Sequence, residues 1–173
     1  MRTRRTVRAI ILALVVISLP LVQACKVNYS LSGASTGTAE TLSIQFFKNN
    51  AALNNPLLSQ VFTEKMKDKF NRETKLKLVD DNGDMQFSGQ ITDYNVAPVA
   101  IQQNVSAARN RLTITIQAKF VNKTNPRFDF DKSFSNFEDF DANVSLASVE
   151  ADLVNTICDK IVQQIFNEAV INW

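Results

Sequence analysis

The chain has 173 residues, with 19 basic and 17 acidic side chains, a formal net charge of +2, two cysteines and no histidine. This length suits one domain with a hydrophobic core of its own. The absence of histidine excludes Ser-His-Asp and Cys-His catalysis and removes the commonest zinc ligand. The sequence also contains neither of the glycine-rich phosphate-binding patterns, GxxxxGK[ST] and GxGxxG.

The first 24 residues have the organisation of a lipoprotein signal peptide. Four arginines precede an apolar run over residues 9–22, which is too short to span a bilayer. A small residue then directly precedes Cys25, as at a lipoprotein cleavage site, although Gln23 stands where a small residue is usual. We expect residues 1–24 to be removed and Cys25 to be acylated. An ordinary secretory signal or an uncleaved anchor is the alternative.

Removal of this segment reverses the charge balance, because the segment carries four basic residues and no acidic ones. The mature chain would have 15 basic and 17 acidic residues and a net charge of −2, which disfavours nucleic-acid binding. Residues 25–40 comprise the cysteine and a stretch rich in Ser, Gly and Thr, which predicts a flexible tether. Residues 41–173 then form a single domain, in which Cys158 is expected to be a small buried side chain.

The first elements follow from the spacing of apolar residues. Alternation after residue 41 predicts a strand with Leu42, Ile44 and Phe46 facing inward. Helical spacing predicts a helix over residues 56–74, which begins with a proline. Asn55 is placed to cap the start of this helix.

The central part of the chain predicts strands joined by tight turns. Residues 76–79 form a short strand, and the Asn-Gly pair within residues 81–84 is a strong hairpin signal. The strand that begins at Met85 changes phase near Asp93, which predicts a β-bulge. Pro98 indicates an edge or an end of that strand.

The last elements have the clearest patterns. Residues 111–120 alternate strictly, with apolar side chains at even positions and polar ones at odd positions. Phe128, Phe130 and Phe134 predict one further strand. A long amphipathic helix follows, which we expect to begin after Ser145 and to end near Ala169.

The order β-α-β-β-β-β-α predicts an α+β fold: a two-layer sandwich with two helices on one face of a mostly antiparallel sheet of four or five strands. The opposite face, which carries Thr113, Thr115 and Gln117, is expected to stay open. The pattern permits either a parallel crossover or a displaced first strand.

Three segments together resemble a known family. They are the signal ending at Cys25 with the strand and helix that follow, the segment Gly83–Tyr94, and the closing helix from Val149 to Trp173. Their order and spacing resemble the LptE-type lipopolysaccharide (LPS)-assembly lipoproteins in the form found in Bacteroidota. The resemblance implies a non-enzymatic lipoprotein, anchored in the inner leaflet of the outer membrane, that plugs a large β-barrel translocon. It implies that the chain helps this barrel fold and helps deliver LPS to the outer leaflet.

The resemblance supplies no residue motif for LPS contact, so candidates come from charge alone. Barrel interiors are polar, which suits the polar strand face and the loop with Gln102, Gln103 and Asn104. LPS phosphates would be drawn to basic side chains. We take Arg109, Arg111 and Lys119 as LPS-contact candidates because they lie near one strand and its entry loop; ordinary surface charges are the alternative.

Two other functions remain open at this point. A periplasm-facing lipoprotein could bind a small ligand or a peptide on the open sheet face or at the phenylalanine cluster. A hydrolase would need a carboxylate pair drawn from Asp129, Asp131 and Glu138. No metal or cofactor is expected. Lys26 follows the anchor cysteine where an Asp would signal inner-membrane retention, which is consistent with an outer-membrane, periplasm-facing position.

Overall fold

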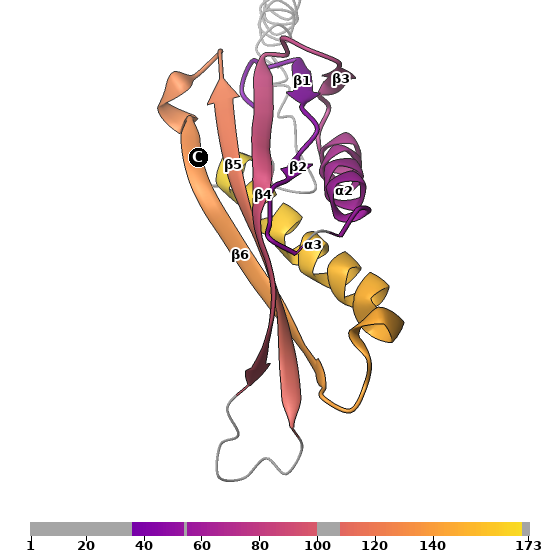
Figure 1. Ribbon diagram of the computed structural model, residues 1–173. Helices are drawn as coiled ribbons and strands as arrows, with labels where there is room; N and C mark the ends of the chain where they lie inside the picture. The colour runs from indigo at the N-terminus through magenta and orange to yellow at the C-terminus, as the bar shows by residue number, and fades with distance from the viewer. Residues whose placement is uncertain (1–35, 54, 100–107, 171–173) are drawn as a thin grey trace, which may run out of the picture.

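The computed structural model describes residues 36–53, 55–99 and 108–170. Within them, two long helices lie on one side of an open mixed sheet, which confirms the α+β two-layer architecture (Figure 1). The helices are α2 (Leu58–Glu73) and α3 (Leu146–Val170), with a short 3-10 helix, η2 (Pro126–Phe128). The strands are β1 (Thr41–Ile44), β2 (Lys48–Asn49), β3 (Lys77–Val79), β4 (Met85–Val99), β5 (Arg109–Asn122) and β6 (Phe130–Asp141). Their order is β3-β1-β4-β5-β6, and β2 also pairs with β4.

Strands β4, β5 and β6 form a long antiparallel meander, whereas β1 is parallel to both of its neighbours, β3 and β4. Helix α2 connects β1 to β3, so the question left open by the sequence is resolved as a parallel crossover. The expected bulge is confirmed, because the register between β4 and β5 shifts between Ile91 and Asp93.

The hairpin expected at the Asn-Gly turn is wrong, because β1 lies between β3 and β4. Asn82 does adopt a left-handed conformation, with φ of 58°, in the bend that connects β3 to β4. Gly83 passes so close to β1 that a Cβ atom would lie 2.6 Å from the backbone nitrogen of Ser43. The Asn-Gly pair therefore marks a change of chain direction, but it does not determine which strands pair.

The carboxylate of Asp84 fixes the start of β1 to this turn. Asp84 Oδ2 accepts hydrogen bonds from the backbone nitrogens of Glu40 and Thr41, at 2.9 and 3.0 Å, and from Thr41 Oγ1 at 2.8 Å. The backbone N–H of Asp84 donates to Thr41 Oγ1 in return. The hydrogen bonds, first of all the one from the Glu40 N–H, hold the pKa of Asp84 below its ordinary value of 3.8.

The core lies between the helices and the sheet and is rich in phenylalanine. The ring of Phe70 on α2 lies 5.0 Å from both Phe87 on β4 and Phe166 on α3, which joins the three elements. Phe87 in turn stacks on Phe120 of β5, at 4.7 Å. Cys158 is fully buried in α3, as expected from its place in the helical pattern.

One residue of the first strand was assigned to the wrong side. Phe46 is 57% exposed, and Phe47 is fully buried. The strand ends at Ile44, so the alternation that predicted an inward Phe46 no longer applies at that position. The ring of Phe47 instead packs edge-on against Phe62 of α2, and its N–H donates to Thr63 Oγ1.

The two helices begin close to their predicted positions. Helix α2 starts at Leu58 rather than at residue 56, and Asn55 Oδ1 accepts the backbone N–H groups of Leu57 and Leu58. Glu150, in the first turns of α3, accepts hydrogen bonds from Tyr94 Oη of β4 and from Asn55 Nδ2. This carboxylate therefore connects the starts of both helices to the sheet.

Candidate functional site

The candidate site is the face of the β4–β5–β6 meander that points away from both helices. Leu112, Ile114 and Ile116 are fully buried against the helices, while the odd-numbered residues between them are only partly covered. The strict alternation of β5 thus divides the sheet into an apolar inner face and a polar outer face, as the sequence predicted. We call this outer face the open face.

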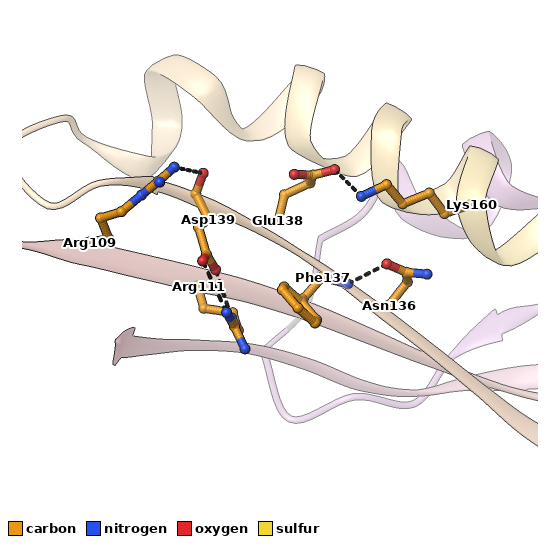
Figure 2. Close-up of polar contacts among 7 residues, drawn as sticks. All are labelled: Arg109, Arg111, Asn136, Phe137, Glu138, Asp139 and Lys160. Atoms are coloured by element: carbon orange, nitrogen blue, oxygen red, sulfur yellow. Dashed lines mark hydrogen bonds and ion pairs between the residues drawn. The ribbon is translucent and has the colours of Figure 1, made fainter. Parts of the chain in front are cut away.

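At one end of the open face, Arg111 is held by a carboxylate on the neighbouring strand (Figure 2). Arg111 Nε donates to Asp139 Oδ1 at 2.7 Å, and Nη2 donates to Oδ2 at 3.0 Å. The guanidinium also lies over the ring of Phe137, 3.6 Å from its centroid. Two bonds and a stacking contact fix the orientation of this side chain.

Arg109 lies beside this pair, and its Nη2 donates to the backbone carbonyl of Asp139 at 3.1 Å. The hydrogen bond from Arg111 holds the pKa of the Asp139 carboxyl below its ordinary value and raises the pKa of Arg111. Asp139 therefore stays ionised and neutralises one of the two arginines. Asp141 lies opposite Arg109 in the register of β5 and β6, so two arginines and two carboxylates meet at this end, and Arg109 is the exposed cation that an anion can approach.

Lys119 does not belong to this cluster, contrary to the sequence argument that grouped the three basic residues. It lies on the same face of β5, but eight residues along the strand from Arg111, or roughly 27 Å away. Lys119 is exposed and borders a polar hollow of about 180 Å³, which Ser43, Gln45, Asp81 and Gln86 also line. The open face thus carries basic groups at both of its ends.

Between the two ends, hydroxyl, amide and carboxylate side chains bond to one another across the strands. Thr115 Oγ1 and Ser135 Oγ lie 3.0 Å apart. Gln117 Nε2 donates to Asp131, and Ser133 Oγ donates to Gln117 Oε1. These bonds satisfy the polar groups within the sheet and give the open face a fixed hydrogen-bonding surface.

Sequence reasoning missed the two residues that organise Arg111, because it ended the last strand too early. The phenylalanines that predicted this strand end at Phe134, yet β6 continues to Asp141 and includes both Phe137 and Asp139. In β6 the phenylalanines at even positions face the helices, whereas Phe137 faces the open side. Phenylalanines on both faces do not alternate with polar residues, so the alternation that marks a strand could not be recognised beyond Phe134. Phe128 lies in η2 rather than in the strand.

The phenylalanine cluster offered as a ligand site is part of the core instead. Phe128, Phe130 and Phe134 are partly buried and pack against the main hydrophobic cluster. The ring of Phe130 lies 5.3 Å from Phe120 and 5.8 Å from Phe134. These contacts make the three rings an extension of the core, although Phe134 also lines an open hollow between β6 and α3.

Several predicted residues fall outside the described part of the chain: Cys25 and the loop residues Gln102, Gln103 and Asn104. Within the described ranges, no group of three or more His, Cys, Asp or Glu side chains could hold a metal ion. The described helices include none that is long and apolar enough to cross a membrane.

The carboxylates considered for hydrolysis each have a structural partner. Asp129 Oδ1 accepts the backbone N–H of Asn122 at 2.7 Å, and Asp131 accepts Gln117 Nε2. Glu138 forms an ion pair with Lys160 of α3 at 2.5 Å. Asp129 therefore stabilises the connection between β5 and β6, Asp131 belongs to the hydrogen bonds of the open face, and Glu138 joins β6 to α3.

Comparison with solved structures finds the same fold in other bacterial proteins. A minor lipoprotein from Acinetobacter baumannii is similar with a TM-score of 0.51 and 12% identity, over 75% of this chain and 91% of that chain. A hypothetical protein from Chlamydia trachomatis is similar with a TM-score of 0.52 and 6% identity, over 76% of this chain and 98% of that chain. These likenesses concern the fold alone.

A search of curated proteins gives no match. The family model described as LptE, lipopolysaccharide-assembly, matches residues 39–169, from just before β1 to the last turn of α3. This match covers most of the chain and agrees with the resemblance carried by the sequence segments. The chain belongs to the LptE lipopolysaccharide-assembly family.

Proposed function

We propose that this chain is a lipoprotein of the outer membrane, anchored through acylated Cys25, that occupies the lumen of the LPS-translocating β-barrel as a plug. In this position it helps the barrel fold and assists delivery of LPS to the outer leaflet. The domain faces the periplasmic side of the membrane and acts without catalysis. Family membership supports a role in LPS assembly, and the remaining statements extend that role to this chain.

The observation that carries the proposal is the open face. Both helices pack on the other side of the sheet, and the open face presents hydroxyl, amide and charged groups that bond to one another. The wall of a barrel lumen is polar, so a plug that fits it needs such a surface rather than an apolar one. The fixed hydrogen bonds also lower the entropic cost of docking, because the side chains are ordered beforehand.

We further propose that Arg109, Arg111 and Lys119 contact the phosphates of LPS. Arg109 and Lys119 are exposed, and each offers a cation at one end of the open face. Arg111 uses two of its five N–H donors on Asp139 and holds the remaining donors in a fixed orientation. The separation of the two ends allows contact with two distant phosphate groups of one or more LPS molecules.

The alternative of a ligand-binding lipoprotein built around the phenylalanine cluster is not favoured, because Phe128, Phe130 and Phe134 pack against the core. A hydrolase is equally unsupported, since Asp129, Asp131 and Glu138 are each engaged in structural contacts.

Depletion of the protein from its own host tests the proposal. We expect the folded, heat-modifiable form of the LPS-translocating barrel to fall in amount, and surface LPS to fall with it. Re-expression of the full chain should restore both, and the Cys25→Ser chain should restore them only poorly. Unchanged barrel folding and surface LPS after depletion would contradict the proposal.

A further inference from the structure

The outer edge of β6 is open, since β6 is the terminal strand of the sheet formed by the described residues. The backbone N–H of Ala142 donates to the carbonyl of Ala108, directly beyond the ends of β6 and β5. Hydrogen-bonded pairs alternate along an antiparallel ladder, so the even-numbered residues of β6 bond to β5. The odd-numbered residues, among them Ser133 and Ser135, therefore direct their N–H and C=O groups outward.

One half of this edge is already covered by side chains of the same chain (Figure 2). The outward N–H of Phe137 donates to Asn136 Oδ1 at 2.9 Å, and the outward carbonyl of Asp139 accepts Arg109 Nη2 at 3.1 Å. Such contacts protect an edge strand from pairing with another chain. The hydroxyls of Ser133 and Ser135 bond on the open face instead, so they do not cover the outward backbone groups beside them.

The part of the edge around Ser133 and Ser135 also borders a groove. Residues 133–135 line an open hollow of about 470 Å³ together with Gln164, Asn167 and Glu168 of α3. Ion pairs between Lys132 and Glu168, and between Glu138 and Lys160, hold α3 against β6 on either side of this hollow. A groove between an edge strand and a helix is the arrangement in which a peptide adds to a sheet as a further strand.

We propose that an extended segment of another polypeptide binds in this groove and pairs with the outward backbone groups of Ser133 and Ser135. The chemistry of the groove favours an uncharged segment, because the ion pair neutralises Lys132 and Glu168 and the other lining groups are neutral. A second copy of this chain fits less well. Pairing of two β6 strands about Ser135 would bring Asp131 of each copy opposite Asp139 of the other, and like charges opposite one another are destabilising.

Site-specific photo-crosslinking in the intact envelope of the host tests this inference. The full-length chain carries Gln164→p-benzoylphenylalanine, because Gln164 is exposed and lines the groove on the side away from the open face. We expect an adduct with a different polypeptide, mapped by mass spectrometry to a segment without charged residues. Ser135→Pro removes an outward N–H while leaving the backbone ladder to β5, and it should lower the adduct roughly fivefold relative to Ser135→Ala, which lacks the same hydroxyl; this is the value of one net hydrogen bond.

Asn167→Arg is a second variant, since it fills the groove from the helix and does not alter the strand. It should also lower the adduct, whereas Asn155→Arg, an exposed site elsewhere on α3, should not. An adduct that both groove variants leave unchanged, that forms only with lipid or only between copies, or that does not form at all would overturn the inference. The inference requires neither the barrel nor LPS, so it stands or falls separately from the proposed function.

Discussion

The side chains of Arg111 and Asp139 form a two-point ion pair across β5 and β6, with the guanidinium lying over the ring of Phe137. The pair lies on the open face, at the end of the meander farther from Lys119. Asp139 and Asp141, which lie opposite Arg111 and Arg109, therefore limit how much positive charge this end of the face presents to an anion.

Replacement of Asp139 should tighten LPS binding. The Asp139→Asn variant removes one negative charge and frees the guanidinium fork of Arg111, so we expect the affinity for purified LPS to rise about two- to fivefold at low salt. The gain should shrink as salt is added, because the contact is exposed. Asp68→Asn, at an exposed site on α2, is the matched charge control. If Asp139→Asn weakened LPS binding and Asp68→Asn did not, the prediction would be contradicted, because the carboxylate of Asp139 would itself be required for binding.

The two ends of the open face should contribute independently to LPS binding. Arg109→Gln and Lys119→Gln should each weaken binding about two- to fivefold, and the double variant should show the product of the two effects, because the residues do not touch. Lys67→Gln, on α2, is the control. Titration with labelled LPS gives the affinity of the parent, the two single variants, the double variant and the control. A double variant no weaker than either single one would place both residues at one shared contact.

Stability should fall in acid partly through Asp84. Its pKa in the folded chain is lowered, so its contribution is present above the unfolded value, about 3.8, and is lost as the pH falls through the folded pKa. The Asp84→Asn variant lacks this contribution, so its stability should lie below that of the parent at pH 6 and converge with it below pH 3.8. Urea unfolding at a series of pH values measures the difference. Curves that stay parallel over this range would contradict the role of Asp84.

Gly89 should tolerate no side chain. A Cβ atom there would lie 2.1 Å from the carbonyl oxygen of Gln117 and 2.6 Å from the ring of Phe47. Gly89→Ala should therefore lower the free energy of unfolding by about 2–4 kcal/mol, because backbone and core must both shift. Ser88→Ala, the neighbouring position on β4, should change it much less. Equal effects of the two substitutions would show that the strands separate easily at this point.

The thiol of Cys158 should not react with alkylating reagents until the domain unfolds. The thiol is fully buried in α3, and burial raises its pKa to about 12. In a Cys25→Ser chain at pH 8 we expect iodoacetamide to modify Cys158 only at the rate of unfolding, and rapidly in urea. Rapid labelling without urea would mean that α3 detaches from the sheet in the folded state.

Local patterns in the sequence were enough to predict β5, α3 and the bulge in β4. Each depends on a period within one segment, such as the alternation from Leu112 to Phe120 or the place of Cys158 in the last helix. The two-layer architecture follows from these elements, because the apolar face of each must be buried against the apolar face of another.

The pairing around β1 could not be predicted in this way. The turn at Asn82 and Gly83 is local, but the insertion of β1 between β3 and β4 depends on contacts between distant residues, such as the bonds from Thr41 to Asp84. The same limit applies to the candidate site. The basic residues were visible in the sequence, but the partner of Arg111 lies 28 residues further along the chain, on another strand.

Co-purification tests the central claim, that this chain occupies the LPS-translocating barrel. The full-length protein, tagged after Trp173, is extracted in detergent from its own host and washed at high salt, and the eluate is identified by mass spectrometry. The account predicts a large outer-membrane barrel in a one-to-one ratio that survives the wash. Elution of the lipoprotein alone, with the same barrel present in the extracted membrane but absent from the eluate, would contradict it.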